Sequence, residues 1–471
     1  MLPSRAWELA LGGLIVFARP IRHRLAAEVA AFAGILLILA SVAALGADHP
    51  FPGVAALPCC LGAALVIWPK GHPTVMARVL SLRPMVFLGL ISYSLYLWHW
   101  PILVFFRHYT NGEPPSALES ALLIALSLAI SIASLRYIET PFRRPRGVTR
   151  VVTTGVATMA AMLTLGLVLV AAEGLVWRIP AAASAVRSNK VMQQWKCPRP
   201  TLEGLEGNLE CVVGAPWDKA HRRAVVWGDS NAQHFKHLLD DVGKRSNVAI
   251  AIWHGCAPHI DNERVRQHNA KQPDRSEKCA ASRRKILDWI ARTKPDIVVM
   301  SASWLGVATT TYHRDLGKRS GETGRELMRD GLISTIGEIG AGPEIIILTD
   351  VPYFRSNPTP CVFGKLSGLL RRPCDESKTT LLASDVLRRH GPTNRVLQRV
   401  ADATGARLIP INANMCRNDT CITELNGEFI YRNRNHIRIN LQVNTRSALI
   451  VATGLGRLFV LARHQAADAV Q

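Results

Sequence analysis

The sequence predicts a multi-helix transmembrane domain followed by an extracytoplasmic three-layer α/β domain with a parallel sheet. Long apolar segments occur only in the first third of the chain. Short apolar strands alternate with helical segments in the remainder, where most of the cysteines also lie. A chain of 471 residues with 48% hydrophobic residues is long enough for two or three domains and too apolar to be wholly soluble. We divide it into a membrane domain of about five helices (1–148), a linking helix (149–184) and an α/β domain (185–471).

Six apolar segments are candidate membrane spans, and the last of them is the linking helix. About 20 apolar residues are needed to cross the roughly 30 Å hydrocarbon core of a bilayer. The first and third segments are shorter than this, so we expect them to be tilted or to span the bilayer incompletely. The six segments are Ala6–Ala18, Ala26–Gly46, Val54–Trp68, Met85–Phe106, Ala117–Tyr137 and Val151–Ala172.

The formal net charge of +21 is explained in part by the loops of the membrane domain. Basic residues occupy every second loop, and loops of this kind face the cytoplasm. The last span then runs outward and delivers the α/β domain to the periplasmic side of a bacterial cell membrane. The basic loops contain Arg19, Arg22 and Arg24, then Lys70, Arg78 and Arg83, and finally Arg143, Arg144, Arg146 and Arg150.

Other basic residues, such as Arg371-Arg372 and Arg388-Arg389, are scattered through the α/β part without interleaved aromatic residues. The simple interpretation is a solvated surface, and the alternative is contact with anionic glycan or lipid headgroups. The chain has no phosphate-binding loop and no dinucleotide fingerprint. We therefore expect no nucleic-acid partner.

Eight of the ten cysteines lie in the polar part of the chain, and this even number suits disulfides in an oxidising compartment. They can be read as four sequential pairs with short loops, with the connectivity left open. Buried reduced cysteines are the alternative. No zinc-type cysteine or histidine spacing occurs, so we expect no metal. The eight cysteines are Cys197, Cys211, Cys256, Cys279, Cys361, Cys374, Cys416 and Cys421.

Short apolar runs alternate with helical segments after residue 220, which favours a parallel sheet covered by helices on both faces. The predicted strands are Ala224–Trp227, Val248–Trp253, Ile297–Met300, Ile345–Leu348 and Arg407–Ile411, and the predicted helices are Asn231–Lys244, Ser276–Arg292, Gly324–Ile339, Thr393–Thr404 and Leu441–Leu461.

A polar turn, Gly228–Asn231, lies between the first predicted strand and the first predicted helix of this domain. A serine at such a turn is well placed to be a nucleophile, and a distant histidine can take its proton. Ser230 and His436, the latter preceded by Asn433, are the candidates. The alternatives are a plain helix cap at Ser230 and a surface histidine at position 436.

Aromatic residues and a histidine interrupt the fourth apolar segment, in the run Ile91–Ile102 (ISYSLYLWHWPI). Polar groups are costly in lipid unless they face other helices or water. We therefore expect Tyr93, Tyr96, His99 and Trp100 to line a cavity, with an interfacial aromatic belt as the alternative.

Three motifs of the membrane part resemble the C-terminal part of the membrane acyltransferase family 3. They are Leu2–Leu9, Ile91–Ile102 and Ile138–Arg143. Bacterial members of that family carry an extracytoplasmic SGNH-type domain after a linking helix, and this chain has the same order. The family has about ten membrane helices, and the start of this chain resembles the family's middle. The resemblance thus implies a truncated or split gene product, or a start that was assigned late, with an N-terminal membrane half or a partner subunit missing.

The α/β part resembles the SGNH hydrolase family, in which a Gly-Asp-Ser turn gives the nucleophile and an Asp-x-x-His segment gives the base. The resemblance implies that Ser230 and His436 are catalytic and that the N–H groups of Ser230 and Gly255 bind an oxyanion. Asn433 stands in the place of the aspartate, and Asn231 stands where many relatives have histidine.

An asparagine orients the imidazole but supplies no charge, so we expect weakened or altered activity. Asp419, Glu424 and Glu428 are carboxylates that could replace the missing aspartate. Trp304 follows the third predicted strand, where the family often has asparagine, and is expected to shape the site.

The resemblance implies a membrane-bound O-acyltransferase, specifically an O-acetyltransferase, that modifies a cell-envelope polysaccharide such as lipopolysaccharide O-antigen or peptidoglycan. Acetyl-CoA or another acyl-CoA is the expected donor, with no bound cofactor. Two alternatives remain open. The same serine chemistry with water as acceptor gives a carbohydrate esterase, and the absent N-terminal helices and Asn433 suit a truncated, non-catalytic partner.

Overall fold

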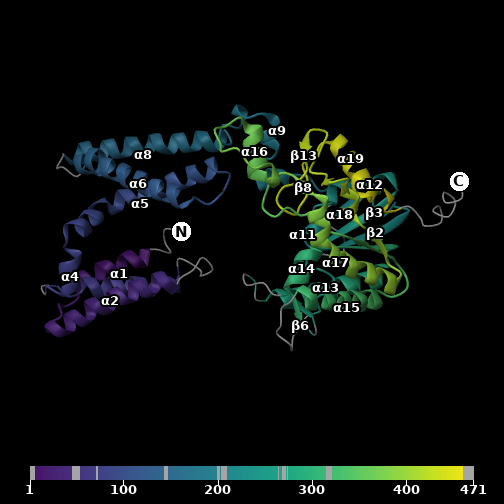
Figure 1. Ribbon diagram of the computed structural model, residues 1–471, viewed down its shortest axis with the longest axis horizontal. Coiled ribbons are helices and arrows are strands. Elements are labelled where there is room, and N and C mark those ends of the chain that lie inside the picture. Colours follow the sequence, from purple (N-terminus) through teal and green to yellow (C-terminus); the bar gives the residue numbers. More distant parts are fainter. Residues whose placement is uncertain are drawn as a thin grey trace. The chain divides into compact units, whose positions relative to one another are not determined.

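The computed structural model describes residues 6–44, 53–70, 73–142, 147–198, 202, 209–261, 263, 265–267, 272, 274–313 and 321–459. The chain forms two compact units (Figure 1). One comprises Met1–His108 and Glu113–Thr158, and the other Tyr109–Gly112 and Met159–Gln471. Residues 2–5 of the first family motif, and the basic residues Arg143, Arg144 and Arg146, lie outside the described residues.

Four described helices are long and apolar enough to cross a membrane. They are α2 (Arg24–Ala44), α5 (Arg83–Tyr109), the stretch Ala117–Phe142 and α8 (Val148–Ala171). The stretch Ala117–Phe142 is α6 (Ala117–Ser134), which continues through a π-helical turn, η3 (Leu135–Glu139), into α7 (Thr140–Phe142).

The two segments expected to be too short are short in the structure. The first helix, α1 (Ala6–Phe17), has 12 residues and the third, α3 (Leu57–Ile67), has 11, which confirms the expectation from their length. A short helix, α4 (Val75–Leu80), was not predicted. It begins at a threonine cap, Thr74, whose hydroxyl accepts the N–H of Ala77 at 3.1 Å.

Glycines allow α2 and α3 to approach closely. A Cβ atom at Gly34 would lie 2.6 Å from the carbonyl oxygen of Gly62, and one at Gly62 would lie 2.7 Å from the carbonyl oxygen of Gly34. Small residues at a helix contact are typical of membrane bundles, where association depends on close packing rather than on apolar burial.

The second unit is built on a six-stranded sheet with the order β1-β3-β2-β5-β7-β9. Neighbouring strands from β3 to β9 pair in parallel, as predicted. At one edge of the sheet, β1, which was not among the predicted strands, pairs with β3 in the antiparallel direction. The strands are β1 (Leu209–Gly214), β2 (Arg222–Gly228), β3 (Val248–His254), β5 (Ile297–Ser301), β7 (Glu344–Leu348) and β9 (Arg407–Ile409).

Helices cover both faces of this sheet, so the domain has three layers (Figure 1). Successive strand residues point to opposite faces. Val226 and Ile252 pack in the cluster that includes α12 (Lys236–Arg245) and α19 (Val443–Thr453). Val225 and Trp253 pack in the opposite cluster, which includes residues of α13 (Arg275–Thr293), of α15 (Gly321–Ile339) and of the C-terminal half of α17 (Ala383–Thr404).

The largest differences between predicted and observed helix bounds in this domain are in three helices. The segment Asn231–Lys244 is divided into α11 (Ser230–Gln233) and α12. Helix α17 begins at Ala383, well before the predicted start at Thr393, and contains Pro392. The last helix, α19, ends at Thr453 because Gly454 adopts a left-handed conformation with φ 79°, a common helix stop.

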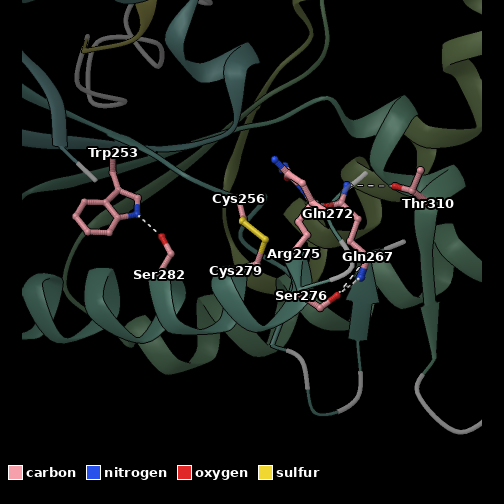
Figure 2. Close-up of a disulfide and its surroundings, with 9 residues drawn as sticks. All are labelled: Trp253, Cys256, Gln267, Gln272, Arg275, Ser276, Cys279, Ser282 and Thr310. Atoms are coloured by element: carbon pink, nitrogen blue, oxygen red, sulfur yellow. Dashed lines mark hydrogen bonds between the residues drawn. A yellow bond between two sulfur atoms is a disulfide. The ribbon is translucent and has the colours of Figure 1, made fainter. Parts of the chain in front are cut away.

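The eight cysteines form four disulfides, and each joins cysteines that are consecutive along the chain. Figure 2 shows the bridge that attaches the turn after β3 to α13, next to the hydrogen bond from Trp253 to Ser282 (3.2 Å). The two cysteines of α3, Cys59 and Cys60, are free. The bridges are Cys197–Cys211, Cys256–Cys279, Cys361–Cys374 and Cys416–Cys421.

Gly228, at the end of β2, allows the close pairing of β2 with β5. A Cβ atom at this position would lie 1.6 Å from the carbonyl oxygen of Ser301. We expect Gly228→Ala to lower the free energy of unfolding by about 3 kcal/mol, because overpacking forces the strands apart. Urea unfolding followed by tryptophan fluorescence measures this change. Gly337→Ala in α15 is the control. A Cβ atom at position 337 would have no neighbour within 4 Å, so this substitution should raise the free energy of unfolding by about 0.5 kcal/mol. Equal effects of the two substitutions on the free energy of unfolding would contradict the role given to Gly228.

Candidate active site

Ser230 is the first residue of α11, directly after strand β2 and Asp229. The Asp229 carboxylate caps this helix by accepting the N–H of Asn231 at 2.8 Å. The N–H of Ser230 lies at the first helical position, where no helix carbonyl accepts it. The serine is half-buried. Its hydroxyl and its N–H therefore lie together at the carboxyl edge of the parallel strands, where α/β sheets bind ligands.

The Ser230 hydroxyl contacts the imidazole of His436. The Oγ–Nε2 distance is 2.8 Å, between residues 206 positions apart in the chain. On the other side of the ring, Nδ1 lies 3.0 Å from the Asn433 side-chain oxygen, which also accepts the N–H groups of Asn435 and His436. The structure thus brings together the three residues that the sequence singled out.

These contacts determine which ring nitrogen carries the proton. The Asn433 oxygen is an acceptor because it already accepts two backbone N–H groups, so Nδ1 of His436 must donate to it. A neutral imidazole with its proton on Nδ1 has a lone pair on Nε2. The Ser230 hydroxyl therefore donates to Nε2, which is the arrangement needed for transfer of the hydroxyl proton to the histidine.

The loop that carries His436 is held by its own backbone and by the segment that follows β7. The N–H of Arg432 donates to the carbonyl of His436 at 2.9 Å, which closes the turn. The carbonyl of Arg434 accepts the N–H of Phe354 at 2.8 Å, and the Thr359 hydroxyl donates to the carbonyl of Arg432 at 2.9 Å. Hydrogen bonds from another segment to the backbone of this loop thus fix it opposite Ser230.

Burial, with a smaller contribution from the Arg432 guanidinium, lowers the pKa of His436 to about 3. An aspartate at position 433 would oppose this shift by stabilising the imidazolium, whereas the amide of Asn433 carries no charge. His436 is accordingly neutral at physiological pH, which is the form that accepts a proton. It is also a weak base, because its charged form is destabilised.

A second histidine, His234, packs against the first. Its ring is fully buried and meets that of His436 edge to face, with centroids 5.7 Å apart. Neither ring nitrogen of His234 has a hydrogen-bond partner among the described residues. Burial lowers the pKa of His234 well below its ordinary value, so it contributes a neutral aromatic wall behind the base.

A buried polar network that the sequence did not predict supports the turn at Ser230. Asp229 accepts the N–H of Ser303 at 3.0 Å, and the Ser303 hydroxyl lies 3.0 Å from the Tyr353 hydroxyl. Tyr353 in turn donates to Asp350 at 2.7 Å. Asp350 and Tyr353 follow the carboxyl end of β7. This position in the sequence was the signal that could have identified them as residues near the site.

The predicted oxyanion role of Gly255 is not supported. Its N–H donates to the carbonyl of Gly228 at 3.0 Å, because the parallel pairing of β2 with β3 continues one residue beyond His254. The N–H of Gly255 is therefore already hydrogen-bonded to the neighbouring strand. The N–H of Ser230 remains the described candidate for binding an oxyanion.

Two other expectations for this site are wrong. Trp304 does not shape it, because its indole is fully buried in the core and donates to the carbonyl of Leu348 at 2.7 Å. Nor does Glu428 replace the missing aspartate, since it pairs with Arg438. The hydrogen-bond partner of Nδ1 is Asn433, and neither Asp419 nor Glu424 is bonded to His436.

The first unit has a cavity of about 530 Å³ between α5 and α6. Tyr96 and His99 line it, as predicted, together with Ser127 and a surround of leucine and isoleucine. Tyr93 and Trp100, the other two predicted residues, are not among its lining residues and are mostly exposed. A helix has only one face toward a cavity, and these two residues lie on another.

Two of the resemblance motifs meet in the same unit. Ser94, in the aromatic run of α5, is buried and its hydroxyl donates to the carboxylate of Glu139 at 3.0 Å. Glu139 ends the π-helical turn η3. Polar contacts of this kind fix neighbouring helices in an apolar environment.

The fold and the Ser230–His436 contact define a three-layer α/β domain with a serine and histidine paired at the carboxyl edge of its sheet. The model of the SGNH domain that is fused to AT3 domains matches residues 196–440, so the chain belongs to this family. An acyltransferase domain model matches residues 3–136.

The chain is also similar to named proteins over part of its length. It is 41% identical over 75 residues to "O-acetyltransferase OatA" of Staphylococcus aureus (strain NCTC 8325 / PS 47), which is 16% of this chain and 12% of that protein. It is 24% identical over 152 residues to "Peptidoglycan O-acetyltransferase OatA" of Listeria monocytogenes serovar 1/2a, which is 30% of this chain and 24% of that protein.

A solved structure, the periplasmic domain of a lipopolysaccharide acetyltransferase from Salmonella ser. Paratyphi A, has a TM-score of 0.36 and 17% identity to the chain. The match covers 51% of this chain and 84% of that one.

Proposed function

We propose that the chain is a membrane-bound O-acyltransferase that transfers acetyl groups to a cell-envelope polysaccharide, either peptidoglycan or lipopolysaccharide O-antigen. The observation that carries the proposal is the 2.8 Å contact from the Ser230 hydroxyl to a histidine whose other nitrogen is held by Asn433. The acyltransferase domain matched in the membrane part, and the O-acetyltransferases to which the chain is similar, favour acyl transfer as the reaction.

The chemistry proceeds in two steps. First, Ser230 attacks the carbonyl carbon of an acyl donor while Nε2 of His436 takes the hydroxyl proton. The bond from the acyl group to its leaving group breaks, and the leaving group takes that proton. Second, a sugar hydroxyl attacks the acyl-serine, His436 accepts its proton, and Ser230 recovers a proton as the ester leaves on the sugar. The free enzyme and an acylated glycan result.

The donor and the location complete the proposal. Acetyl-CoA, or another acyl-CoA, supplies the acyl group on the cytoplasmic side, and the membrane unit passes it outward. The α/β domain lies on the periplasmic side of the bacterial inner membrane. The four disulfides support an extracytoplasmic position, and the apolar helices support a membrane protein.

A carbohydrate esterase is the second candidate. Ser230 and His436 are half-buried rather than sealed from solvent, so water can reach the acyl-serine. The same intermediate then yields free acetate, and the glycan becomes the substrate instead of the acceptor.

The test uses the full chain in nanodiscs with two labelled donors. p-Nitrophenyl acetate reaches the serine without the membrane unit, whereas acetyl-CoA requires the membrane unit. Label should appear on the Ser230 peptide and then on added peptidoglycan or lipopolysaccharide. Release of acetate as the main product in the presence of acceptor would favour the esterase. Label from p-nitrophenyl acetate alone would mean that the chain needs a partner for acyl delivery. No label on Ser230 with either donor would overturn the proposal.

The pH dependence of p-nitrophenyl acetate turnover is the next expectation. His436 has a pKa lowered to about 3, so its neutral, proton-accepting form is present above that pH and is lost only as pH falls through it. An ordinary histidine would lose activity near about pH 6.5. We expect kcat/KM to be nearly flat from about pH 5 to about pH 8. An acid limb near neutrality would show that the base has an ordinary pKa.

A further inference from the structure

A cavity of about 1000 Å³ opens in the second unit beside the loop that carries His436. One of its walls is Phe354, whose N–H donates to the carbonyl of Arg434 at 2.8 Å, two residues before His436. Another is Arg389, which donates to the carbonyl of Tyr353 at 2.5 Å. Tyr353 belongs to the network that supports the serine turn. The cavity and the serine–histidine pair thus share the segment that follows β7.

Cationic side chains dominate this cavity. Three arginines converge on one carboxylate, Asp385. Arg355 and Arg388 each approach it at 2.6 Å, and Arg389 at 3.1 Å. The hydrogen bond from Arg355, followed by the other guanidiniums, lowers the pKa of Asp385, so it stays charged. One carboxylate neutralises one guanidinium, and the cluster keeps an excess of two positive charges.

The remaining charges of the cavity do not remove this excess. Lys378 adds one positive charge and Glu376 one negative charge, so the lining as a whole has four cationic and two anionic side chains. Like charges held together are unfavourable. This excess of positive charge therefore favours binding of an anion from outside the chain.

A helix N-terminus adds to the same field. The 22-residue helix α17 begins at the cavity, where Leu382 and Ser384 form part of the lining, and no side chain caps its first turn. The N–H of Ala383 is used by the carbonyl of Asp419. Those of Ser384 and Asp385 also lie in the first turn, where N–H groups have no acceptor within the helix and favour bound anions.

The exposure of the arginines separates this site from an internal ion-pair network. The side chains of Arg355 and Arg388 are 70% and 71% exposed, whereas that of Asp385 is 19% exposed. The carboxylate is thus the inner anchor, and the guanidiniums face the open cavity. They are oriented before any ligand arrives, which lowers the entropy cost of binding.

We propose that this cavity binds a carboxylate group of the glycan acceptor and so selects acidic polysaccharides for the neighbouring serine. The proposal rests on the proposed function, because a glycan is an acceptor only if the chain transfers acyl groups. Binding of the glycan can nevertheless be measured without catalysis. Guanidinium groups recognise planar carboxylates and phosphates through paired hydrogen bonds, and the hydroxyls of Ser377, Thr380 and Ser384 suit the hydroxyl groups of a sugar.

The test measures binding of fluorescent oligogalacturonate, an acidic oligosaccharide, to the full chain in neutral-lipid nanodiscs. All proteins carry Ser230→Ala, so no acyl transfer disturbs the readout. We expect Arg355→Glu and Arg388→Glu each to weaken binding by about tenfold or more. Arg388→Lys should retain most of the affinity, and affinity should fall with added salt.

The matched control is Arg292→Glu, which reverses an exposed arginine on α13 whose guanidinium donates to the carbonyl of Asp288 in its own helix. It should leave binding unchanged. The proposal is overturned if the three reversals have equal effects, if a neutral dextran oligosaccharide binds as well as oligogalacturonate, or if sn-glycerol 3-phosphate binds where the oligosaccharide does not. The last outcome would assign the site to lipid headgroups.

Failure of the proposed function gives a different result. If acyl transfer proceeds without Ser230 while the arginine reversals still abolish oligogalacturonate binding, the glycan site stands and the serine assignment falls.

Discussion

Replacement of Ser230 by alanine is expected to reduce acyl transfer and p-nitrophenyl acetate turnover by at least about 10³-fold. The substitution removes the oxygen that forms the ester bond and leaves His436 without its hydrogen-bond donor. Initial rates with both donors measure the loss. A polar N–H at the helix start remains, so residual turnover above that in water is expected.

Two comparisons sharpen this result. Ser334→Ala removes an exposed hydroxyl of α15 and should leave the rates unchanged. The double variant Ser230→Ala/His436→Ala should be no slower than either single variant, because the two side chains act as one unit. Retention of more than about a tenth of the rate by Ser230→Ala would exclude the serine as the nucleophile.

Asn433→Asp is expected to raise the rate by about 10- to 100-fold, an unusual gain for a single substitution. The aspartate oxygen can keep the three hydrogen bonds that the amide oxygen accepts, and its charge stabilises the imidazolium that forms when His436 takes the serine proton. The reverse change in serine proteases costs about 10⁴, in part because the histidine takes the wrong tautomer. Here Asn433 already selects the productive tautomer, so only the electrostatic part remains to be gained.

The pH profile identifies the cause of any gain. An aspartate beside Nδ1 raises the pKa of His436, so the acid limb of kcat/KM should move upward by at least about one pH unit. Asn435→Asp adds the same charge to a neighbour whose side chain is not bonded to Nδ1, and it should have a much smaller effect. A fall in rate for Asn433→Asp, or an unmoved acid limb, would contradict the role given to Asn433.

The core strands were predictable because strands buried on both faces of a parallel sheet are continuous apolar runs, as in β3 and β5. Strand β1 was not found, because it is an edge strand that begins with Leu209 and the charged Glu210. The predicted helix Thr393–Thr404 is shorter than α17, which extends through Pro392 back to Ala383, and a proline is ordinarily a helix-start signal. Local pattern cannot show that surrounding packing carries a helix through a proline.

The serine and histidine were predictable from their positions at strand ends, since the carboxyl ends of parallel strands meet at one edge. The network of Asp229, Ser303, Tyr353 and Asp350 was not, because two of its contacts join residues 74 and 50 positions apart and depend on the whole sheet. The predicted oxyanion role of Gly255 is not supported for a related reason. Its motif was in the expected place, but the register of β2 with β3 uses its N–H.

The order of the cysteines has a consequence for biogenesis. Each bridge closes a segment of 5 to 23 residues, and no bridge encloses a cysteine of another. In the extracytoplasmic location proposed for this domain, every thiol would meet its correct partner before the next pair of cysteines is translocated. We therefore expect simple oxidation in order of appearance to give the native set without a disulfide isomerase.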